Sequence, residues 1–384
     1  MMRICLVSSS FYPATFYGGP ISATWDLSKE IARNNIEVYV STTNANGFKQ
    51  LNVNTNKFIK KKENLQVKYY NEQIINKFSI AFIFGIWSDL KKANIVYIQY
   101  LFHYTVLFSL VFSAIQNKRI IICPRGSFSQ FTLSNKLAFI KSIWITIFIK
   151  PFIKNTKWQA SSYLEKADIK REFPKAKITI VNDGVDFNAF QDAVILPKTD
   201  LVNKYTNKSF DKVSTVFFSM GRLHKIKGFD VIIDAFALFL KEHPNSKLLI
   251  AGADDGVQLE LENQIKKLDL SESVFLIGMV NHEQKCELLS SCTAFALASE
   301  FESFGIVIAE ALACGCPVIA SNKTPWKELE INNCGILAEN QKRDFYKAFI
   351  RIIAKKYNKN QIKEYVKSRY DLKIITKGFI NIFK

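Results

Sequence analysis

Short apolar runs alternate with helix-length segments along nearly the whole chain, and the alternation occurs twice. In the first half we expect helices at 21–34 and 163–172 and strands at 3–8, 36–43, 94–100, 119–124, 157–162 and 177–185. In the second half we expect strands at 213–221, 247–253, 273–280, 293–299 and 316–321, with a helix after each of the first four. Strands that are separated by helices usually pair in parallel. The sequence therefore predicts an α/β fold with two doubly wound, Rossmann-like sheets.

The length of 384 residues also fits two domains, each large enough to bury its own core. Between residues 187 and 212 the periodicity is lost and Asn, Lys and Asp accumulate, so we place the domain link there. We predict an N-terminal domain over 1–190 and a C-terminal domain over 191–365. The final helical stretch, 366–384, is a candidate for completing the first domain. Two such sheets that face each other would place the carboxyl ends of their strands, where ligands bind, across a common cleft.

Positive charge is concentrated in the first half of the chain. Residues 1–190 carry 25 Lys+Arg against 11 Asp+Glu, a net charge of +14, whereas residues 191–384 carry a net charge of +4. The simple interpretation is a solvated face of a Lys-rich chain. The more specific one is an anionic membrane surface, which attracts basic residues. No nucleic acid partner is expected, because the chain contains no RNA-recognition, zinc-finger or basic-zipper motif.

Two apolar segments raise the question of membrane contact. Residues 96–115 are long enough to cross a bilayer, and only Gln99 and His103 among them are clearly polar. Their first part is β-branched and aromatic, and a separate strand follows, so we expect a strand, a buried helix and another strand. Residues 137–153 either lie in a membrane interface as an amphipathic helix or are buried against the sheet, and burial is the simpler expectation.

Several other site classes lack their signature. The seven cysteines are scattered without a CxxC pair, which excludes a disulfide framework and a zinc ribbon and fits a reducing compartment. The first residues show no secretory signal pattern, so we expect a cytoplasmic protein. GxGxxG, GxxxxGK[ST] and HExxH are all absent, which removes support for dinucleotide, P-loop and zincin enzymes. The four histidines are dispersed and no DxD ends a strand, so we predict no metal site.

The stretch SEFESFGIVIAEALACGCPVIAS, residues 299–321, has the strongest site pattern. We expect a helix from Phe304 to residue 313, capped by Ser303 or the residue before it. The unpaired amides of its first turn would bind an anion, and Gly305 would let a phosphate approach the backbone. Glu302 precedes this turn and is suited to accept hydrogen bonds from sugar hydroxyls. Glu310 lies about 7.5 Å further along the helix axis, where it could hold a ribose. The alternative is that the two glutamates are ordinary surface acids.

A second pattern is MGRLHKIKGF, which follows a buried strand of the second half. Arg222 and Lys227 are cations at the end of this strand, with Gly221 and Gly228 on either side. Fixed cations stabilise the negative charge that develops on a diphosphate leaving group. The alternative is that Arg222 and Lys227 are two ordinary cations without a binding role in a basic chain. In the loop after the first strand, Gly18 and Gly19 form either a flexible turn or a backbone that approaches a ligand.

These patterns together resemble a known family. ExxxxxxxE from Glu302 to Glu310, within ESFGIVIAEALACGCPVIAS, is similar to the signature of the retaining nucleotide-sugar glycosyltransferases of family 4, which adopt the two-domain GT-B fold. GRLHKIKGFDVIIDAF, VNDGVDF and the early Gly-Gly loop resemble the same family at the same relative positions. The resemblance covers nearly the whole chain.

The resemblance assigns roles to the residues that match. It implies that the donor is a nucleoside-diphosphate sugar, with the diphosphate on Arg222 and Lys227 and the ribose on Glu310. Glu302 would act on the donor sugar as a catalytic residue. Backbone groups of four further residues would contact phosphate or sugar: Gly19, Ser303, Phe304 and Gly305.

The chain departs from the family pattern at two places. Many members carry a histidine at the end of the strand here written IVYIQYLFHY, where our alignment places Gln99, with His103 four residues later. Either His103 takes the catalytic role from a shifted loop, or it packs or caps a helix. Arg125 in PRGSF, like Gly18, is a possible contact for acceptor or phosphate. Residues 323–328 replace the family's Gly-Gly-x-Pro-Glu, which leaves the donor open.

We therefore expect a retaining, metal-independent hexosyltransferase without a cofactor, in which the leaving diphosphate takes the proton of the acceptor hydroxyl. The N-terminal domain would bind a carbohydrate acceptor, and its charge suggests a lipid-linked glycan of polysaccharide, lipopolysaccharide O-antigen or capsule synthesis at the inner face of the cell membrane. Two alternatives remain: a GT-B sugar-nucleotide epimerase, and a non-catalytic basic protein that binds membrane or nucleic acid.

Overall fold

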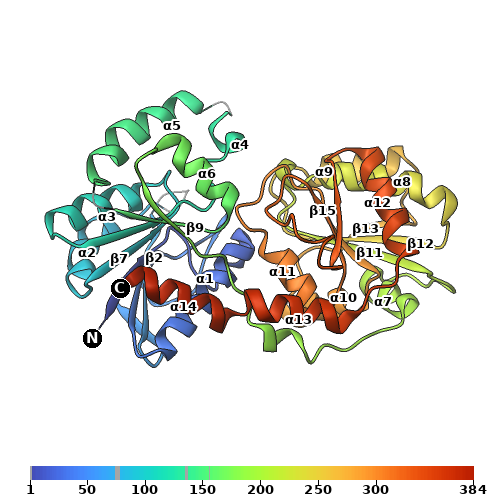
Figure 1. The fold of residues 1–384 in the computed structure, drawn as a ribbon, viewed down its shortest axis with the longest axis horizontal. Helices are drawn as coiled ribbons and strands as arrows, with labels where there is room; N and C mark the ends of the chain where they lie inside the picture. The colour runs from blue at the N-terminus through green and yellow to red at the C-terminus, as the bar shows by residue number, and fades with distance from the viewer. Residues whose placement is uncertain (1, 74–77, 135–136, 155) are drawn as a thin grey trace. The chain divides into compact units, whose positions relative to one another are not determined.

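The computed structural model describes residues 2–73, 78–134, 137–154 and 156–384 and consists of two compact units (Figure 1). Unit 1 comprises Met1–Gly184 and Leu372–Lys384, and unit 2 comprises Val185–Asp371. The division after Gly184 lies six residues before the boundary that the sequence suggested.

Unit 1 is built on an eight-stranded sheet in the order β10-β9-β8-β7-β1-β2-β6-β5. All neighbours pair in parallel except β5 and β6, which are antiparallel. The strands are β1 (Arg3–Val7), β2 (Glu37–Thr43), β5 (Phe58–Lys62), β6 (Leu65–Tyr70), β7 (Ile95–Gln99), β8 (Arg119–Cys123), β9 (Lys157–Ala160) and β10 (Lys177–Ile180). The six strands expected in this half are confirmed.

The β5–β6 hairpin and the small pair β3 (Ala45–Asn46) and β4 (Lys49–Gln50) were not expected from the sequence. Three of the five residues of β5 are lysines, which are depleted in strands. β5 is an edge strand, so its lysines can stay in water while its main chain pairs with β6.

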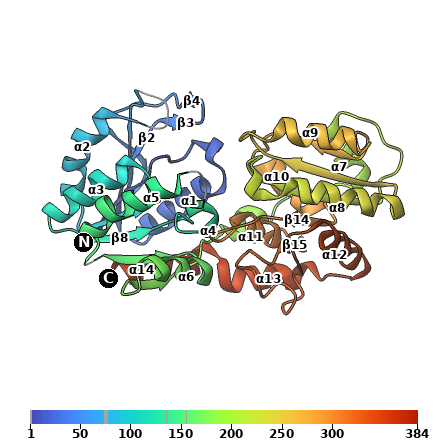
Figure 2. The same cartoon turned by 90° about the horizontal axis from the view of Figure 1, so that it is seen from above.

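Helices cover both faces of this sheet, as alternate strand residues show. Ile4 and Leu6 of β1 belong to a core shared with α1 and α14, whereas Cys5 and Val7 belong to a core shared with α2, α3 and η2. The helices of the unit are α1 (Gly19–Arg33), α2 (Ile80–Lys91), α3 (Tyr104–Ile115), α4 (Gln130–Leu133), α5 (Ala138–Trp144), α6 (Tyr163–Glu172) and α14 (Leu372–Phe383). Figure 2 shows α2 and α3 side by side, and the two helices are in contact.

The apolar stretch 96–115 divides into β7 and the twelve-residue helix α3, as expected. Over the described ranges, no helix combines the length and apolar character that a membrane crossing requires. Residues 137–153 form α5, the π-helical turn η2 (Ile145–Ile149) and the 3-10 turn η3 (Lys150–Phe152). The expected burial of this segment holds on one face only: Ile145 and Ile149 are buried, whereas Phe139 and Ile140 are mostly exposed.

Unit 2 has a six-stranded, fully parallel sheet in the order β13-β12-β11-β14-β15-β16. Its strands are β11 (Thr215–Met220), β12 (Ser246–Ala251), β13 (Val274–Leu276), β14 (Ala294–Leu297), β15 (Val318–Ser321) and β16 (Gly335–Ala338). Its helices are α7 (Lys198–Thr206), α8 (Phe229–Glu242), α9 (Gln258–Lys267), α10 (His282–Ser291), α11 (Ile306–Ala313), α12 (Lys342–Ala354) and α13 (Lys359–Tyr370). The five expected strands are confirmed, and β16 is an addition.

Residues 187–212, where we placed the domain link, belong to unit 2 and contain regular structure. Residues Phe187–Phe190 form the 3-10 turn η4, and α7 follows at Lys198–Thr206. Leu201 and Val202 are fully buried in the core of unit 2, so tertiary packing stabilises a helix whose polar composition hides it in the sequence.

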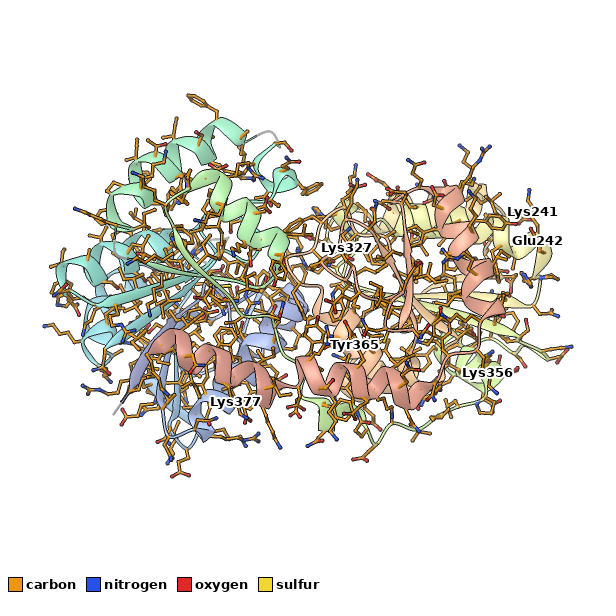
Figure 3. The ribbon with its side chains drawn as sticks, viewed as in Figure 1. Lys241, Glu242, Lys327, Lys356, Tyr365 and Lys377 are labelled. Atoms are coloured by element: carbon orange, nitrogen blue, oxygen red, sulfur yellow. The ribbon has the colours of Figure 1, made fainter. Side chains whose placement is uncertain are left out.

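The expected C-terminal helix is two helices that belong to different units. α13 ends at Tyr370 within unit 2, where Tyr365, labelled in Figure 3, donates a hydrogen bond to Glu328 at 3.4 Å. α14 packs against α1 in unit 1 and buries Phe379, while Lys377 projects to solvent (Figure 3). The last helix is therefore a structural part of unit 1.

Replacing Phe379 by alanine tests this role of α14. Phe379 is 1% exposed and contacts the ring of Tyr97 on β7, so Phe379→Ala should lower the free energy of unfolding of unit 1 by about 3–5 kcal/mol. The measurement is urea unfolding followed by far-ultraviolet circular dichroism. Ile374→Ala, on the exposed side of the same helix, is the control and should change stability little. Equal effects of the two changes would show that α14 does not support the core.

Candidate active site

The segment with the two glutamates connects β14 to α11. The helix begins at Ile306, with Gly305 as the N-cap residue at φ +81° and ψ +60° and no side chain capping the first turn. The predicted start at Phe304 with a cap from Ser303 was wrong. The left-handed backbone of Gly305 keeps this residue outside the helix, so the helix begins two residues later than predicted. The first-turn amides are left without a side-chain cap, as an anion site requires.

Glu302 and Lys227 form an ion pair in unit 2. Oε1 of Glu302 accepts hydrogen bonds from Nζ of Lys227 at 2.6 Å and from Oγ of Ser299 at 2.8 Å. The two charged side chains are only 12% and 18% exposed. A Cβ on Gly305 would lie 3.4 Å from Cγ of Glu302, so the glutamate lies beside the cap of α11. The structure thus joins two residues that the sequence separates by 75 positions.

A glycine allows the loops that carry Lys227 and Glu302 to come close together. Gly228 follows the 3-10 turn η5 (Lys225–Lys227) at φ +64°, and a Cβ there would lie 2.2 Å from the carbonyl oxygen of Ala298. The amide of Glu300 donates to the carbonyl of Ile226 at 2.8 Å. The loops after β11 and β14 are therefore in direct main-chain contact at the carboxyl ends of adjacent strands, where α/β sheets bind ligands.

Arg222 lies in the same loop but has another partner. It forms an ion pair with Asp255, from the loop after β12, and remains 39% exposed. His224 lies between the two candidate cations, and its Nδ1 accepts a hydrogen bond from the amide of Ile226 at 3.1 Å. Burial lowers the pKa of His224, Asp255 raises it in part, and Arg222 and the nearby lysines lower it further. In the sequence, His224 was considered only as a metal ligand, although its position between Arg222 and Lys227 was a visible signal.

Glu310 is 6% exposed on α11, and its charge is also paired. Its Oε1 lies 2.5 Å from Nζ of Lys285 on α10, and both side chains are largely buried. The ammonium of Lys285 also lies 5.1 Å from the ring centre of Phe190. Sequence analysis missed Lys285, because nothing in its own segment indicates that α10 packs beside α11.

Phe304 contributes a packed ring as well as a backbone. The side chain is 2% exposed, and its carbonyl accepts a 2.6 Å hydrogen bond from Nε1 of Trp326. Trp326 is part of the 323–328 segment that departs from the family pattern. The residue that this chain has at position 326 therefore holds the turn before α11 through a hydrogen bond. The predicted contacts of Ser303, Phe304 and Gly305 with phosphate or sugar remain predictions.

The other predicted residues belong to unit 1. Gly18, at φ +77°, is the N-cap of α1, and Gly19 is the first residue of that helix. Gln99 is buried at the end of β7, where its Oε1 accepts from Oγ1 of Thr24 at 3.1 Å. Among the described residues its Nε2 has no hydrogen-bond partner. The predicted contacts of Gly18, Gly19 and Gln99 with acceptor, phosphate or donor remain predictions.

His103 and Arg125 both have structural roles in unit 1. His103 is the N-cap of α3, and its Nδ1 accepts from the amide of Thr105 at 3.4 Å, which matches the capping alternative. Arg125, with its side chain 2% exposed at φ +52°, forms an ion pair with Asp183 at 2.5 Å. Its charge is therefore buried within unit 1 rather than presented at a surface. The catalytic role of His103 and the contact of Arg125 with acceptor or phosphate stay predictions.

Metal-binding groups do not gather anywhere in the described ranges: no three His, Cys, Asp or Glu side chains are placed to hold an ion. The seven cysteines are free and buried. Each candidate carboxylate of unit 2 is instead paired with a cation, which is an arrangement suited to binding a charged ligand by exchange of partners.

Comparisons with known proteins concern the fold and part of unit 2. Residues 204–369, which lie within unit 2, match the family model described as Glycosyl transferases group 1. Sucrose-phosphate synthase from Thermosynechococcus elongatus has a TM-score of 0.77 to this chain at 17% identity, with 100% of this chain and 98% of that chain covered. Anabaena HepE in complex with UDP and glucose has a TM-score of 0.73 at 19% identity, with 100% and 99% covered. The fold is GT-B. This confirms the predicted fold class.

Among curated proteins, the chain is similar to the N-acetylgalactosamine-N,N'-diacetylbacillosaminyl-diphospho-undecaprenol 4-alpha-N-acetylgalactosaminyltransferase of Campylobacter jejuni. The two are 32% identical over 185 residues, which are 45% of this chain and 48% of that protein. The chain spans about half of the length of such curated relatives, or less. These matches support the glycosyltransferase family that the GT-B motifs suggested.

Gly228→Ala should separate the two loops of the site. The new Cβ would overlap the carbonyl oxygen of Ala298 in a left-handed backbone, so we expect a loss of about 3 kcal/mol or more in unfolding free energy. Urea unfolding measures it. The control is Gly256→Ala, at φ +96° with no atom within 4 Å of the new Cβ, which should show only the backbone strain, about 1–2 kcal/mol. Similar losses for the two variants would contradict the close packing.

Lys285→Met leaves the carboxylate of Glu310 without its cation in a largely buried place. We expect this variant to lose about 3 kcal/mol of unfolding free energy. The double variant Lys285→Met, Glu310→Gln should recover part of the loss, since the unpaired charge is removed. Lys208→Met breaks an exposed pair with Glu272 and serves as the control, with little expected change. A Lys285→Met protein as stable as the wild type would show that the pair has no energetic role.

Proposed function

We propose that this protein is a retaining glycosyltransferase that moves a hexose from a nucleoside-diphosphate sugar to a hydroxyl of a carbohydrate acceptor. The single observation that carries the proposal is the pairing of Lys227 with Glu302 beside the glycine-capped start of α11. This arrangement offers a cation, a carboxylate and unpaired amides within one short region. A diphosphate next to a sugar requires those three kinds of group.

In the proposed reaction, the diphosphate lies against Lys227 and Arg222 and against the first amides of α11. As the bond between the anomeric carbon and the phosphate oxygen breaks, negative charge develops on that oxygen. The fixed cations and helix amides stabilise this charge more in the transition state than in the ground state. Glu302 is then released from Lys227 and accepts hydrogen bonds from donor hydroxyls. Glu310 stays paired with Lys285 and accepts a hydrogen bond from the ribose.

Retention is proposed to follow from attack on the face that the diphosphate leaves. The departing phosphate oxygen takes the proton of the acceptor hydroxyl, and the new glycosidic bond forms on the same face. This route needs neither a protein nucleophile nor a metal ion.

The acceptor is proposed to be a lipid-linked glycan at the inner face of the cell membrane, in polysaccharide, O-antigen or capsule synthesis. Two observations support this class. The name of the Campylobacter jejuni relative includes a sugar carried on diphospho-undecaprenol. Residues 1–190 of this chain carry a net charge of +14, which suits an anionic membrane surface. The structure of Anabaena HepE was solved with UDP-glucose, which makes that nucleotide sugar the first donor to try.

Binding of nucleoside diphosphates tests the donor site. We expect one of UDP, GDP or ADP to raise the melting temperature, and Lys227→Met to remove most of this shift. In a transfer assay with the matching nucleotide sugar, Lys227→Met should lower kcat/KM about a hundredfold, because the leaving group loses its cation. Lys347→Met, in an exposed pair on α12, is the control and should behave as the wild type.

The product also distinguishes the alternatives. Nuclear magnetic resonance of the product should show the anomeric configuration of the donor. An inverted product would refute the proposed mechanism. A new sugar epimer formed from the donor alone would favour the epimerase. A melting temperature that no nucleoside diphosphate changes, but that lipid or RNA raises, would favour the non-catalytic binding protein.

A further inference from the structure

Exposed apolar side chains gather on one segment of unit 1. Six of the large hydrophobic residues that are at least 39% exposed lie between positions 131 and 147. We call them the α5 ridge: Phe131, Leu137, Phe139, Ile140, Ile143 and Ile147. The most exposed are Phe139 at 77% and Ile140 at 60%. Apolar surface of this density in a water-exposed place usually marks an interaction site.

The ridge is the outer side of a segment whose inner side is fixed. Ile145 and Ile149 are buried in the core that η2 shares with α2 and α3. Nε1 of Trp144 donates to the carbonyl of Leu101 at 2.9 Å, which ties the segment to the loop before α3. Phe139, Ile140, Ile143 and Ile147 follow helical spacing, so they share one face. The side chains of the ridge are therefore exposed on a segment that the core of unit 1 holds in place.

Along the sequence, the charged residues around the ridge are all cations. Residues 90–164 contain ten Lys or Arg and no Asp or Glu at all. The acid just before this range, Asp89, is 1% exposed and paired with Lys68. Lys150 and Lys154 are exposed directly after the ridge. An exposed apolar face whose neighbours along the chain are cations has the composition of segments that lie in the interface of anionic membranes.

We propose that the α5 ridge inserts into the interfacial layer of an anionic lipid bilayer, with Lys150 and Lys154 on the lipid headgroups. A second copy of the chain fits this surface less well, because two such faces would bring their lysines together without an acid to pair them. A bilayer supplies both the apolar layer and the negative charge. The inference specifies the surface behind the proposed membrane location and does not depend on the transfer reaction.

Vesicle binding tests the proposal. The full chain should sediment with vesicles that contain phosphatidylglycerol and only weakly with vesicles of phosphatidylcholine alone. The variant Phe139→Ser, Ile140→Ser, Ile143→Ser should lower the partition coefficient on phosphatidylglycerol vesicles at least about tenfold, because three apolar side chains no longer enter the interface. The control variant is Leu259→Ser, Ile331→Ser, at two apolar positions of unit 2 that are 69% and 82% exposed, and it should bind as the wild type.

The lysines should act through charge alone. Lys150→Gln, Lys154→Gln should weaken binding to phosphatidylglycerol vesicles and flatten its dependence on salt, while binding to phosphatidylcholine stays the same. Trp144 provides a local readout: its fluorescence should be quenched by brominated lipid in the wild type and the control, but not in the serine variant. Unchanged circular dichroism would confirm that the variants are folded.

Three results would overturn the inference. They are unchanged vesicle binding by the serine variant, binding that does not depend on lipid charge, and a wild-type dimer in sedimentation velocity that the serine variant abolishes while lipid binding stays the same. The proposed function fails separately, through loss of nucleotide binding or sugar transfer. Transfer to a soluble acceptor by a protein that ignores vesicles would therefore reject this inference alone.

Discussion

The main-chain contact between two loops of unit 2 determines the geometry of the candidate site. Gly228 lies so close to the carbonyl of Ala298 that no side chain fits, and the amide of Glu300 completes the contact by donating to Ile226. Because the backbones are fixed in this way, Lys227 reaches Glu302 over a short distance with little freedom. The proposed donor site therefore depends on the glycine backbone that brings the two loops together.

Paired charges define how unit 2 could accept a polyanion. Lys227, Arg222 and Lys285 each have an acidic partner, and only Arg222 is substantially exposed. A diphosphate that binds there replaces one carboxylate partner of a cation with another anion, so the cation need not be desolvated again. The released carboxylate then becomes an acceptor for sugar hydroxyls. Binding of the diphosphate and orientation of the sugar would thus be linked through the same ion pair.

Unit 1 uses its candidate residues differently. Arg125 is held by Asp183, Gln99 by Thr24, and His103 caps α3, so these polar groups stabilise the ends of strands and helices. The two helical layers of the unit also differ. α14 completes the layer that contains α1, whereas the layer with α5 leaves an apolar ridge exposed. The excess of positive charge and the exposed apolar ridge both occur in this unit. Together they are the physical basis of the proposed contact with a membrane.

The sequence by itself determined the parallel strands of both sheets, because a strand buried on both faces requires a continuous apolar run, which can be recognised without a structure. It also located Glu302 and Lys227, since glycine and charge at strand ends form a local pattern. Only the tertiary structure decided that Lys285 pairs with Glu310 and that Arg125 is buried, because both depend on which helices and strands become neighbours. Likewise, the late start of α11 follows from the left-handed backbone of Gly305, and the position of α14 follows from packing between distant segments. The local composition of the sequence encodes neither the start of α11 nor the position of α14.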